Sequence, residues 1–355
     1  MTSLECKQNN PPIPVSIITG FLGSGKTTLL NELIQHPDMD KVAVLINEFG
    51  EVGLDHQLVE TISEDIILLQ SGCICCQIKD DLVTTLTDLF DRRESGEIEP
   101  FSRVLIETTG VADPVPVIQV LISEPTLSRR FRLDITMTLV DCVFGHSQLA
   151  KHAEALKQVA LADRLILTKT DLVDTAAITA LQKQIKQINP SAFITTAVNG
   201  VIHPQVLFNR RFADRSKEEQ QRSVEKWLNK DAHIASGQHL DGVSSICVSL
   251  DEPIDWECFS EWLDSLVFSR AENILRIKGI LNIAGKEQPL VIQGVQHMFY
   301  APTTLKKWPT ADRQSHIVFI TYQFNPRAIK TSLEKFLGLG SATPVNIEEE
   351  IVNAR

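Results

Sequence analysis

The sequence predicts an α/β protein with a mainly parallel sheet, followed by a smaller α+β domain. Short apolar segments alternate with helical patterns up to about residue 205. A glycine-rich turn joins the first apolar segment to the first helical pattern. After a polar stretch, the order changes to strand, helix and several strands in succession. Strands that alternate with helices favour a parallel sheet covered on both faces.

In the first domain, each expected strand is a short apolar run. These runs lie at 13–19, 41–46, 65–69, 103–107, 134–141, 163–168 and 192–196. A helix is expected after the first strand, because Leu29, Leu30, Leu33 and Ile34 recur at helical spacing. A second helix is expected from about Lys79 to Arg93.

The second domain is predicted to have the order βαβββα. Its strands are expected at 243–250, near 274–284, near 289–299 and at 315–323, and its helices at 255–270 and 326–337. The predicted organisation is a flexible arm (1–12), a first domain (13–208), a linker (209–241), a C-terminal domain (242–340) and a tail (341–355).

Composition narrows the classes of function. The 355 residues include 34 Lys and Arg against 45 Asp and Glu, so the net charge is −11, which disfavours a nucleic-acid partner. No unbroken apolar run is long enough to cross a membrane, and no membrane partner is expected. The N-terminus lacks the apolar core of a signal peptide, which predicts a cytoplasmic location with reduced thiols.

The stretch "GFLGSGKT" (20–27) fits the phosphate-loop pattern at every fixed position. Its glycines let backbone N–H groups turn toward a phosphate, and the following helix adds its positive N-terminal end. Lys26 is predicted to offset charge on the transferring phosphoryl group, and Thr27 to bind Mg²⁺. The predicted nucleotide-binding residues here are Gly20, Gly23, Ser24, Gly25, Lys26, Thr27 and Thr28.

Two further segments complete the predicted nucleotide site. "LIETTG" places Glu107 at the end of a strand, near the magnesium, and Gly110 three residues later, where its N–H faces the γ-phosphate. In "LILTKTDL", Asp171 can accept two hydrogen bonds from guanine, and the Lys169 stem can lie along the purine face. This predicts GTP rather than ATP, and Thr168 can bond to the phosphate loop.

Cys73, Cys75 and Cys76 lie within four residues, between a predicted strand and helix. Three thiolates form an incomplete tetrahedral shell, which suits a transferable Zn²⁺, with Cu(I) or Co²⁺ as other candidates. Glu48 and Glu51 are candidate additional ligands. A redox pair at Cys73 and Cys76 and a structural role remain alternatives. The other four cysteines are isolated, and the nine histidines are scattered.

The motifs together resemble the CobW family of metal-associated GTPases. They are "GFLGSGKTTLL", "NEFGEVGLD", "GCICC", "ETTGVADP" and "TKTD", and "ILRIKGIL", "IQGVQHMFYAP" and "SHIVFITYQF" resemble the family's C-terminal domain. The resemblance covers roughly residues 13–337. Some relatives have a carboxylate where this chain has Ile46, which makes Glu51 the better carboxylate candidate.

The resemblance implies a GTP-hydrolysing metallochaperone with GTP or GDP, Mg²⁺ and Zn²⁺, and with Co²⁺ as a second candidate metal. Its predicted partner is a client metalloprotein bound by the C-terminal domain, and a homodimer is a further candidate. Slow intrinsic turnover is expected, because no residue stands out as a base for the attacking water. The alternatives are a metal-sensing interaction module with negligible turnover and, less favoured, a nucleotide kinase.

Overall fold

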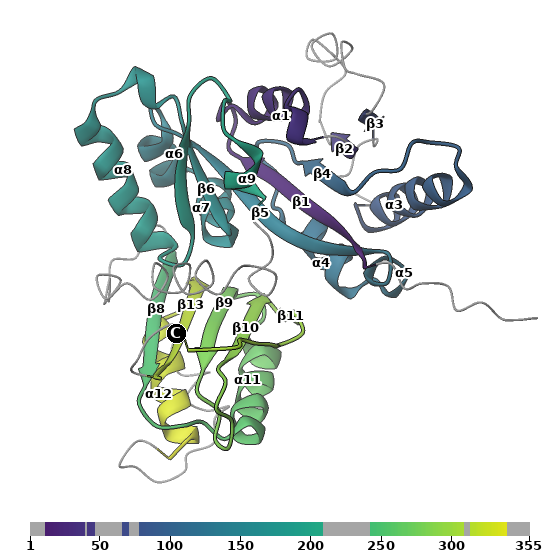
Figure 1. Ribbon diagram of the computed structural model, residues 1–355. Helices are drawn as coiled ribbons and strands as arrows, with labels where there is room; N and C mark the ends of the chain where they lie inside the picture. Colours follow the sequence, from purple (N-terminus) through teal and green to yellow (C-terminus); the bar gives the residue numbers. More distant parts are fainter. Residues whose placement is uncertain are drawn as a thin grey trace, which may run out of the picture.

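The computed structural model describes residues 11–39, 41–46, 66–70, 78–208, 242–308 and 313–338, and these residues form two packed domains (Figure 1). The first contains a seven-stranded sheet and the second a six-stranded sheet. The predicted fold class is confirmed. No helix among the described residues combines the length and apolar character that a membrane span requires.

All strand pairs of the first sheet are parallel. The strands are β1 (Ile13–Gly20), β2 (Val42–Ile46), β3 (Ile66–Gln70), β4 (Arg103–Glu107), β5 (Phe131–Asp141), β6 (Arg164–Thr168) and β7 (Phe193–Ala197). Their order across the sheet is β3-β2-β4-β1-β5-β6-β7. The carboxyl ends of β1, β4 and β6 therefore share one edge, and the predicted nucleotide motifs follow these ends.

Helices connect the strands of the first sheet. They are α1 (Lys26–Ile34), η1 (Pro37–Met39), α3 (Ile78–Ser95), α4 (Val115–Ser123), α5 (Pro125–Ser128), α6 (Gly145–Lys151), α7 (Ala153–Leu161), η2 (Thr170–Leu172), α8 (Thr175–Ile188) and α9 (Pro204–Leu207). α1 and α9 pack in one buried cluster on one face of the sheet, and α3, α4, α7 and α8 pack on the other. Both faces are covered, which explains why the strands are apolar runs without alternation.

The second domain is an antiparallel sheet in the order β11-β10-β9-β13-β8, with β12 paired to β10. Its elements are β8 (Val243–Leu250), α11 (Trp256–Arg270), β9 (Ile274–Leu281), β10 (Leu290–Val295), β11 (Met298–Phe299), β12 (Thr303–Thr304), β13 (Ser315–Tyr322) and α12 (Pro326–Phe336). The single strand predicted near 289–299 is wrong. A turn with Gln296 at a φ of 52° splits it into β10 and β11.

The two faces of the second sheet have different neighbours. Along β13, Ile317 and Phe319 join a cluster with α11 and α12, whereas Val318 and Ile320 join the core of the first domain. This alternation is the two-residue period of a strand. The second sheet is therefore buried on both faces, by its own helices on one and by the first domain on the other.

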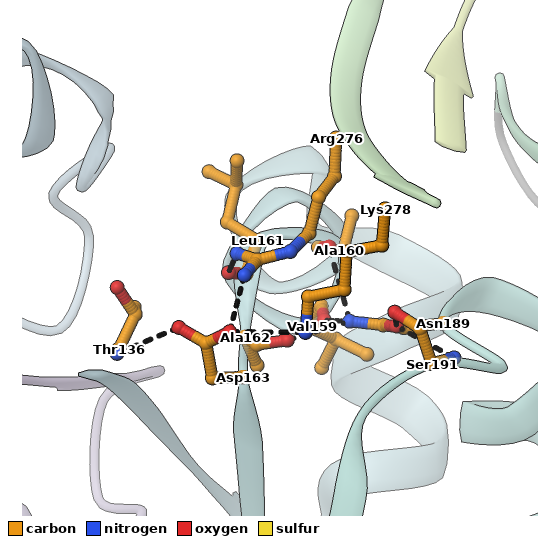
Figure 2. A network of polar contacts seen from close by, with 10 residues as sticks. All are labelled: Thr136, Val159, Ala160, Leu161, Ala162, Asp163, Asn189, Ser191, Arg276 and Lys278. Carbon is orange, nitrogen blue, oxygen red and sulfur yellow. Dashed lines mark hydrogen bonds and ion pairs between the residues drawn. The ribbon is translucent and has the colours of Figure 1, made fainter. Parts of the chain in front are cut away.

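A polar network also joins the domains where α7 ends and β6 begins (Figure 2). Asp163 pairs with Arg276, and one of its carboxylate oxygens lies 3.0 Å from Lys278 Nζ. Its other oxygen accepts a hydrogen bond of 3.1 Å from the Thr136 N–H. Arg276 also donates to the Leu161 carbonyl. The C-terminal domain therefore contacts the edge of the first sheet where the strands begin, opposite the edge that carries the nucleotide motifs.

Candidate nucleotide-binding site

The phosphate loop needs glycine at the positions where the backbone turns most sharply. Gly20, Gly23 and Gly25 have φ values of 145°, 72° and 91°, a region that other residues rarely adopt. At Gly20, a Cβ would also lie 2.5 Å from the Leu139 carbonyl oxygen. The loop is thus held close to β5, and α1 begins immediately after Gly25.

The N-terminus of α1 has the features of an anion site. Gly25 precedes the helix without a side-chain cap, and the first turn has no acidic residue. Lys26 is largely buried, and its Nζ lies 3.0 Å from the Gly20 carbonyl oxygen, across the loop. Within the described part of the chain, the buried Ser24 hydroxyl has no hydrogen-bond partner. These donors fit the phosphates of a nucleotide.

Glu107 and Thr27 come together at the carboxyl end of the sheet. The Thr27 hydroxyl donates a hydrogen bond of 3.0 Å to Glu107 Oε1. Glu107 is 5% exposed, at the end of β4. A hydroxyl and a buried carboxylate side by side are oxygen ligands of the kind that Mg²⁺ prefers, so the donor set fits the ion expected with a nucleoside triphosphate.

Gly110 packs directly against the phosphate loop. A Cβ at Gly110 would lie 2.6 Å from Leu22 Cδ2 and 2.8 Å from Leu22 Cα. The buried Gln158 side chain fixes this segment, because its amide nitrogen donates to the carbonyls of Gly110 at 3.2 Å and Ala112 at 3.1 Å. Gln158 carried no signal in the sequence, because a glutamine within a helical pattern indicates no particular role.

The segment predicted to bind guanine begins at the end of β6. Thr168 Oγ1 donates a 2.8 Å hydrogen bond to the Ser24 carbonyl, which joins this segment to the phosphate loop. Lys169 has a φ of 56°, and its Nζ lies 2.6 Å from Asp141 Oδ2. Asp171 is exposed in η2. Asp141 was missed as a site residue, although it ends β5 just as Glu107 ends β4.

The loop after β7 packs against the first turn of α1. Gly200 has a φ of 78°, and a Cβ there would lie 2.7 Å from the Thr28 carbonyl oxygen. The structure therefore brings the phosphate loop, the β4 end, the β6 end and the loop after β7 to one edge of the sheet. These segments carry all the nucleotide-site residues expected from the sequence.

The predicted metal motif lies outside the described residues. This applies to Cys73, Cys75 and Cys76 and to the candidate ligands Glu48 and Glu51. The flanking elements are described: β3 ends at Gln70, and α3 begins at Ile78. Since β3 pairs with β2 in parallel, β3 ends at the same carboxyl edge of the sheet as the strands that lead into the nucleotide motifs.

The three free cysteines of the described region are poor candidates for metal binding. Burial, together with the nearby Asp141 charge, raises the pKa of Cys142 from 9.0 to about 11. Burial also raises the pKa of Cys247, and a hydrogen bond to Asp255 raises that of Cys258. A raised pKa depletes the thiolate, the form that binds metal.

Comparisons with known proteins agree with this arrangement. Residues 14–196 match the family described as "CobW/HypB/UreG, nucleotide-binding domain", and residues 243–337 match the "Cobalamin synthesis protein cobW C-terminal domain". The chain is 38% identical over 328 residues to the "Zinc chaperone YjiA" of Escherichia coli, covering 92% of this chain and 99% of the relative. A "Zinc chaperone CobW" from Sinorhizobium is 28% identical, with 81% and 87% covered.

A solved structure shows the same overall architecture. The "Crystal structure of Zn(II)-bound YjiA GTPase from E. coli" has a TM-score of 0.70 and 32% sequence identity to this chain. The alignment covers 92% of this chain and 99% of the other. The likeness therefore extends over both domains.

Proposed function

Because the chain belongs to the CobW family, we propose that it hydrolyses GTP and uses the nucleotide state to control a zinc ion carried to a client protein. The observation that supports hydrolysis most directly is the hydrogen bond between Thr27 and Glu107. It joins the phosphate-loop helix to the strand that leads into Gly110. The relatives named zinc chaperones support the metal cargo.

Each residue of the site has a physical role in this proposal. The loop N–H groups and Lys26 bind the phosphates and offset their charge. Thr27 and Glu107 would hold Mg²⁺, and the ion would supply positive charge that offsets the charge of the phosphates. The Gly110 N–H faces the γ-phosphate, a place where the presence or loss of that group is sensed. Asp171 selects guanine, and Thr168 ties its segment to the loop.

The cargo site is proposed at Cys73, Cys75 and Cys76, with Glu51 as a fourth ligand and Co²⁺ as a second candidate metal. Glu51 follows β2 and the cysteines follow β3, so both segments leave neighbouring strands at the nucleotide edge. A shift of either segment with the γ-phosphate would change the metal shell. The C-terminal domain is proposed to bind the client.

Glu107→Gln tests the hydrolytic site. We expect GTP turnover to fall at least about tenfold, because the neutral amide holds Mg²⁺ poorly, while a fluorescent GDP analogue still binds. Glu97→Gln is a matched control, since Glu97 is exposed and pairs with Arg92. Unchanged turnover in Glu107→Gln would refute the assigned magnesium ligand. Negligible wild-type turnover, with and without zinc, would favour the metal-sensing interaction module instead.

Asp171→Asn tests base recognition. The amide cannot accept both guanine hydrogen bonds, so we expect weaker GTP binding and stronger binding of xanthosine triphosphate. Asp174→Asn is the control, because Asp174 caps α8 through the Ala177 N–H and asparagine caps equally well. The guanine assignment is wrong if Asp171→Asn leaves the ratio of the two affinities unchanged.

Replacement of Cys73, Cys75 and Cys76 by serine tests the cargo site. We expect loss of the near-ultraviolet thiolate charge-transfer band that bound Co²⁺ gives in the wild type. Zinc affinity of the wild type should also differ between a non-hydrolysable GTP analogue and GDP. Equal affinity in the two nucleotide states would overturn the chaperone mechanism, whichever residues bind the ion.

A further inference from the structure

Two histidines that are far apart in the sequence meet on the α1 face of the first domain. His36 lies just after α1, and His203 lies just before α9. Their ring centroids are 4.9 Å apart, with the planes inclined at 64°. Asp38 lies beside them, with Oδ2 3.7 Å from His203 Nε2. One ligand atom from each of the three side chains lies within 4.8 Å of the other two.

Buried residues hold both segments in place. Met39 is buried beside Asp38, and the short helix η1 turns the chain so that the Asp38 N–H points at His36 Nδ1, 3.1 Å away. On the other side, Leu207 of α9 packs into the core cluster of α1. The three side chains are half-buried to exposed, so solvent ions can reach them, but their backbones are fixed.

The position suits a cation. The end of α1 carries the negative pole of the helix dipole, and no basic residue lies in its last turn. Asp38 adds a further negative charge. The nearby imidazoles are the side chains that bind Zn²⁺, Co²⁺ and Ni²⁺ well, in contrast to Mg²⁺.

The spacing is close to that of a tetrahedral site. Ligand atoms around zinc lie about 3.4 Å apart, given bonds of about 2.0–2.1 Å. Movements of about 1 Å at the side-chain tips therefore close the shell around an ion. In both rings, Nδ1 accepts a hydrogen bond from a backbone N–H, at 3.1 Å in His36 and 3.3 Å in His203. An imidazole that binds a metal through Nε2 carries its proton on Nδ1, which can then no longer accept. Metal binding would therefore replace two long hydrogen bonds with two metal–nitrogen bonds.

We propose that His36, Asp38 and His203 form a second metal site, for a divalent ion of the zinc type with water completing the shell. It shares no residue with the cysteine motif, and it lies at the C-terminal end of α1, at the opposite end of that helix from the phosphate loop. An ion here would join the end of α1 to the segment that leads into residues 209–241 and the C-terminal domain. The competing explanation is a surface ion pair between His203 and Asp38 that binds no metal, which would contribute little stability.

Cobalt spectroscopy distinguishes the two explanations. In the full chain with Cys73, Cys75 and Cys76 replaced by serine, we expect Co²⁺ to give visible d–d bands without a thiolate charge-transfer band. Adding His203→Ala to the serine variant should lower its affinity for Co²⁺ at least about tenfold, and adding Asp38→Asn instead should also lower that affinity. His297→Ala is the matched control, because His297 is exposed in the turn between β10 and β11.

Three results would overturn the site: no Co²⁺ binding to the serine variant, binding that survives His203→Ala, or an equal loss in His297→Ala. Competition by Zn²⁺ in the same titration measures the affinity of this site for zinc. Unchanged circular dichroism and GTP turnover in His203→Ala show that the loss is local. The assignment of the cargo site to the cysteines is tested by the thiolate band, which the histidine variants do not affect, so the two outcomes are independent.

Discussion

Asp163→Asn should weaken the attachment of the C-terminal domain. The substitution keeps the shape of the side chain and an oxygen that can accept the Thr136 hydrogen bond. It removes the negative charge that faces Arg276 and Lys278 across the domain boundary (Figure 2). Arg276 is 2% exposed, so its guanidinium loses its carboxylate partner in a buried place.

The structure gives the size of the effect. Burial raises the pKa of Asp163, but the charges of Arg276 and Lys278 lower it more, and the net result is a fall from 3.8 to about 2. A shift of this size corresponds to about 2–3 kcal/mol of stability. Breaking a buried pair costs about 3–5 kcal/mol, but Arg276 keeps its bond to the Leu161 carbonyl. We therefore expect a loss of about 2–3 kcal/mol at pH 7.

The sign of the pH dependence follows from the lowered pKa. The ionised Asp163 carboxylate stabilises the folded state fully at pH values above 3.8, its pKa in the unfolded chain. This stabilisation is lost as pH falls toward about 2, its pKa in the folded protein. The difference between wild type and Asp163→Asn should therefore shrink across this window. An equal difference at pH 7 and at pH 2.5 would contradict the electrostatic origin.

Urea unfolding with two probes provides the assay. All four tryptophans lie at or beyond residue 227, so their fluorescence reports on the C-terminal half, while release of a fluorescent GDP reports on the first domain. In Asp163→Asn the two transitions should separate, with the tryptophan transition at lower urea. Asp134→Asn is the control, because Asp134 pairs with Arg103 and Arg132 inside the first domain. Coincident transitions and a shift below about 0.5 kcal/mol would refute the reasoning.

Two further predictions concern the nucleotide edge. Gly110→Ala should lower GTP affinity at least about tenfold, because its Cβ would displace Leu22 of the phosphate loop. Gly96→Ala should not lower GTP affinity, because a Cβ at Gly96 meets no atom and the backbone strain at its φ of 75° lies in the turn after α3, outside the site. Equal GTP affinity in the two variants would contradict the contact. Alkylation of Cys142 should be slow at pH 8 and should accelerate as pH rises toward its pKa of about 11, as followed by mass spectrometry of the labelled peptide; fast labelling at pH 8 would contradict the raised pKa.

The sequence predicted which segments meet at the carboxyl edge of the first sheet, because the signals that mark these segments are local. A phosphate loop requires glycine at fixed positions, and the parallel sheet brings the ends of β1 and β4 together, so Glu107 could be placed near Thr27 before their contact was known. The fold class followed from the same alternation of strands and helices.

Contacts between segments that are distant in the chain have no local pattern in the sequence from which they could be predicted. Gln158, which holds the Gly110 segment, is one polar residue in an ordinary helix. His36 and His203 looked scattered because their meeting depends on how α9 packs beside α1. The split between β10 and β11 was missed because Gln296, rather than glycine or asparagine, adopts the left-handed turn.

The two ends of β6 face different neighbours. Thr168 bonds to the phosphate loop at one end, and Asp163 pairs with the C-terminal domain at the other. The helices α11 and α12 lie in the C-terminal domain, away from α1 and the phosphate loop (Figure 1). A protein docked on either helix would thus bind at a distance from the phosphate loop. GDP could depart and GTP could enter while such a complex stayed assembled, so repeated rounds of exchange would not require the partner to dissociate.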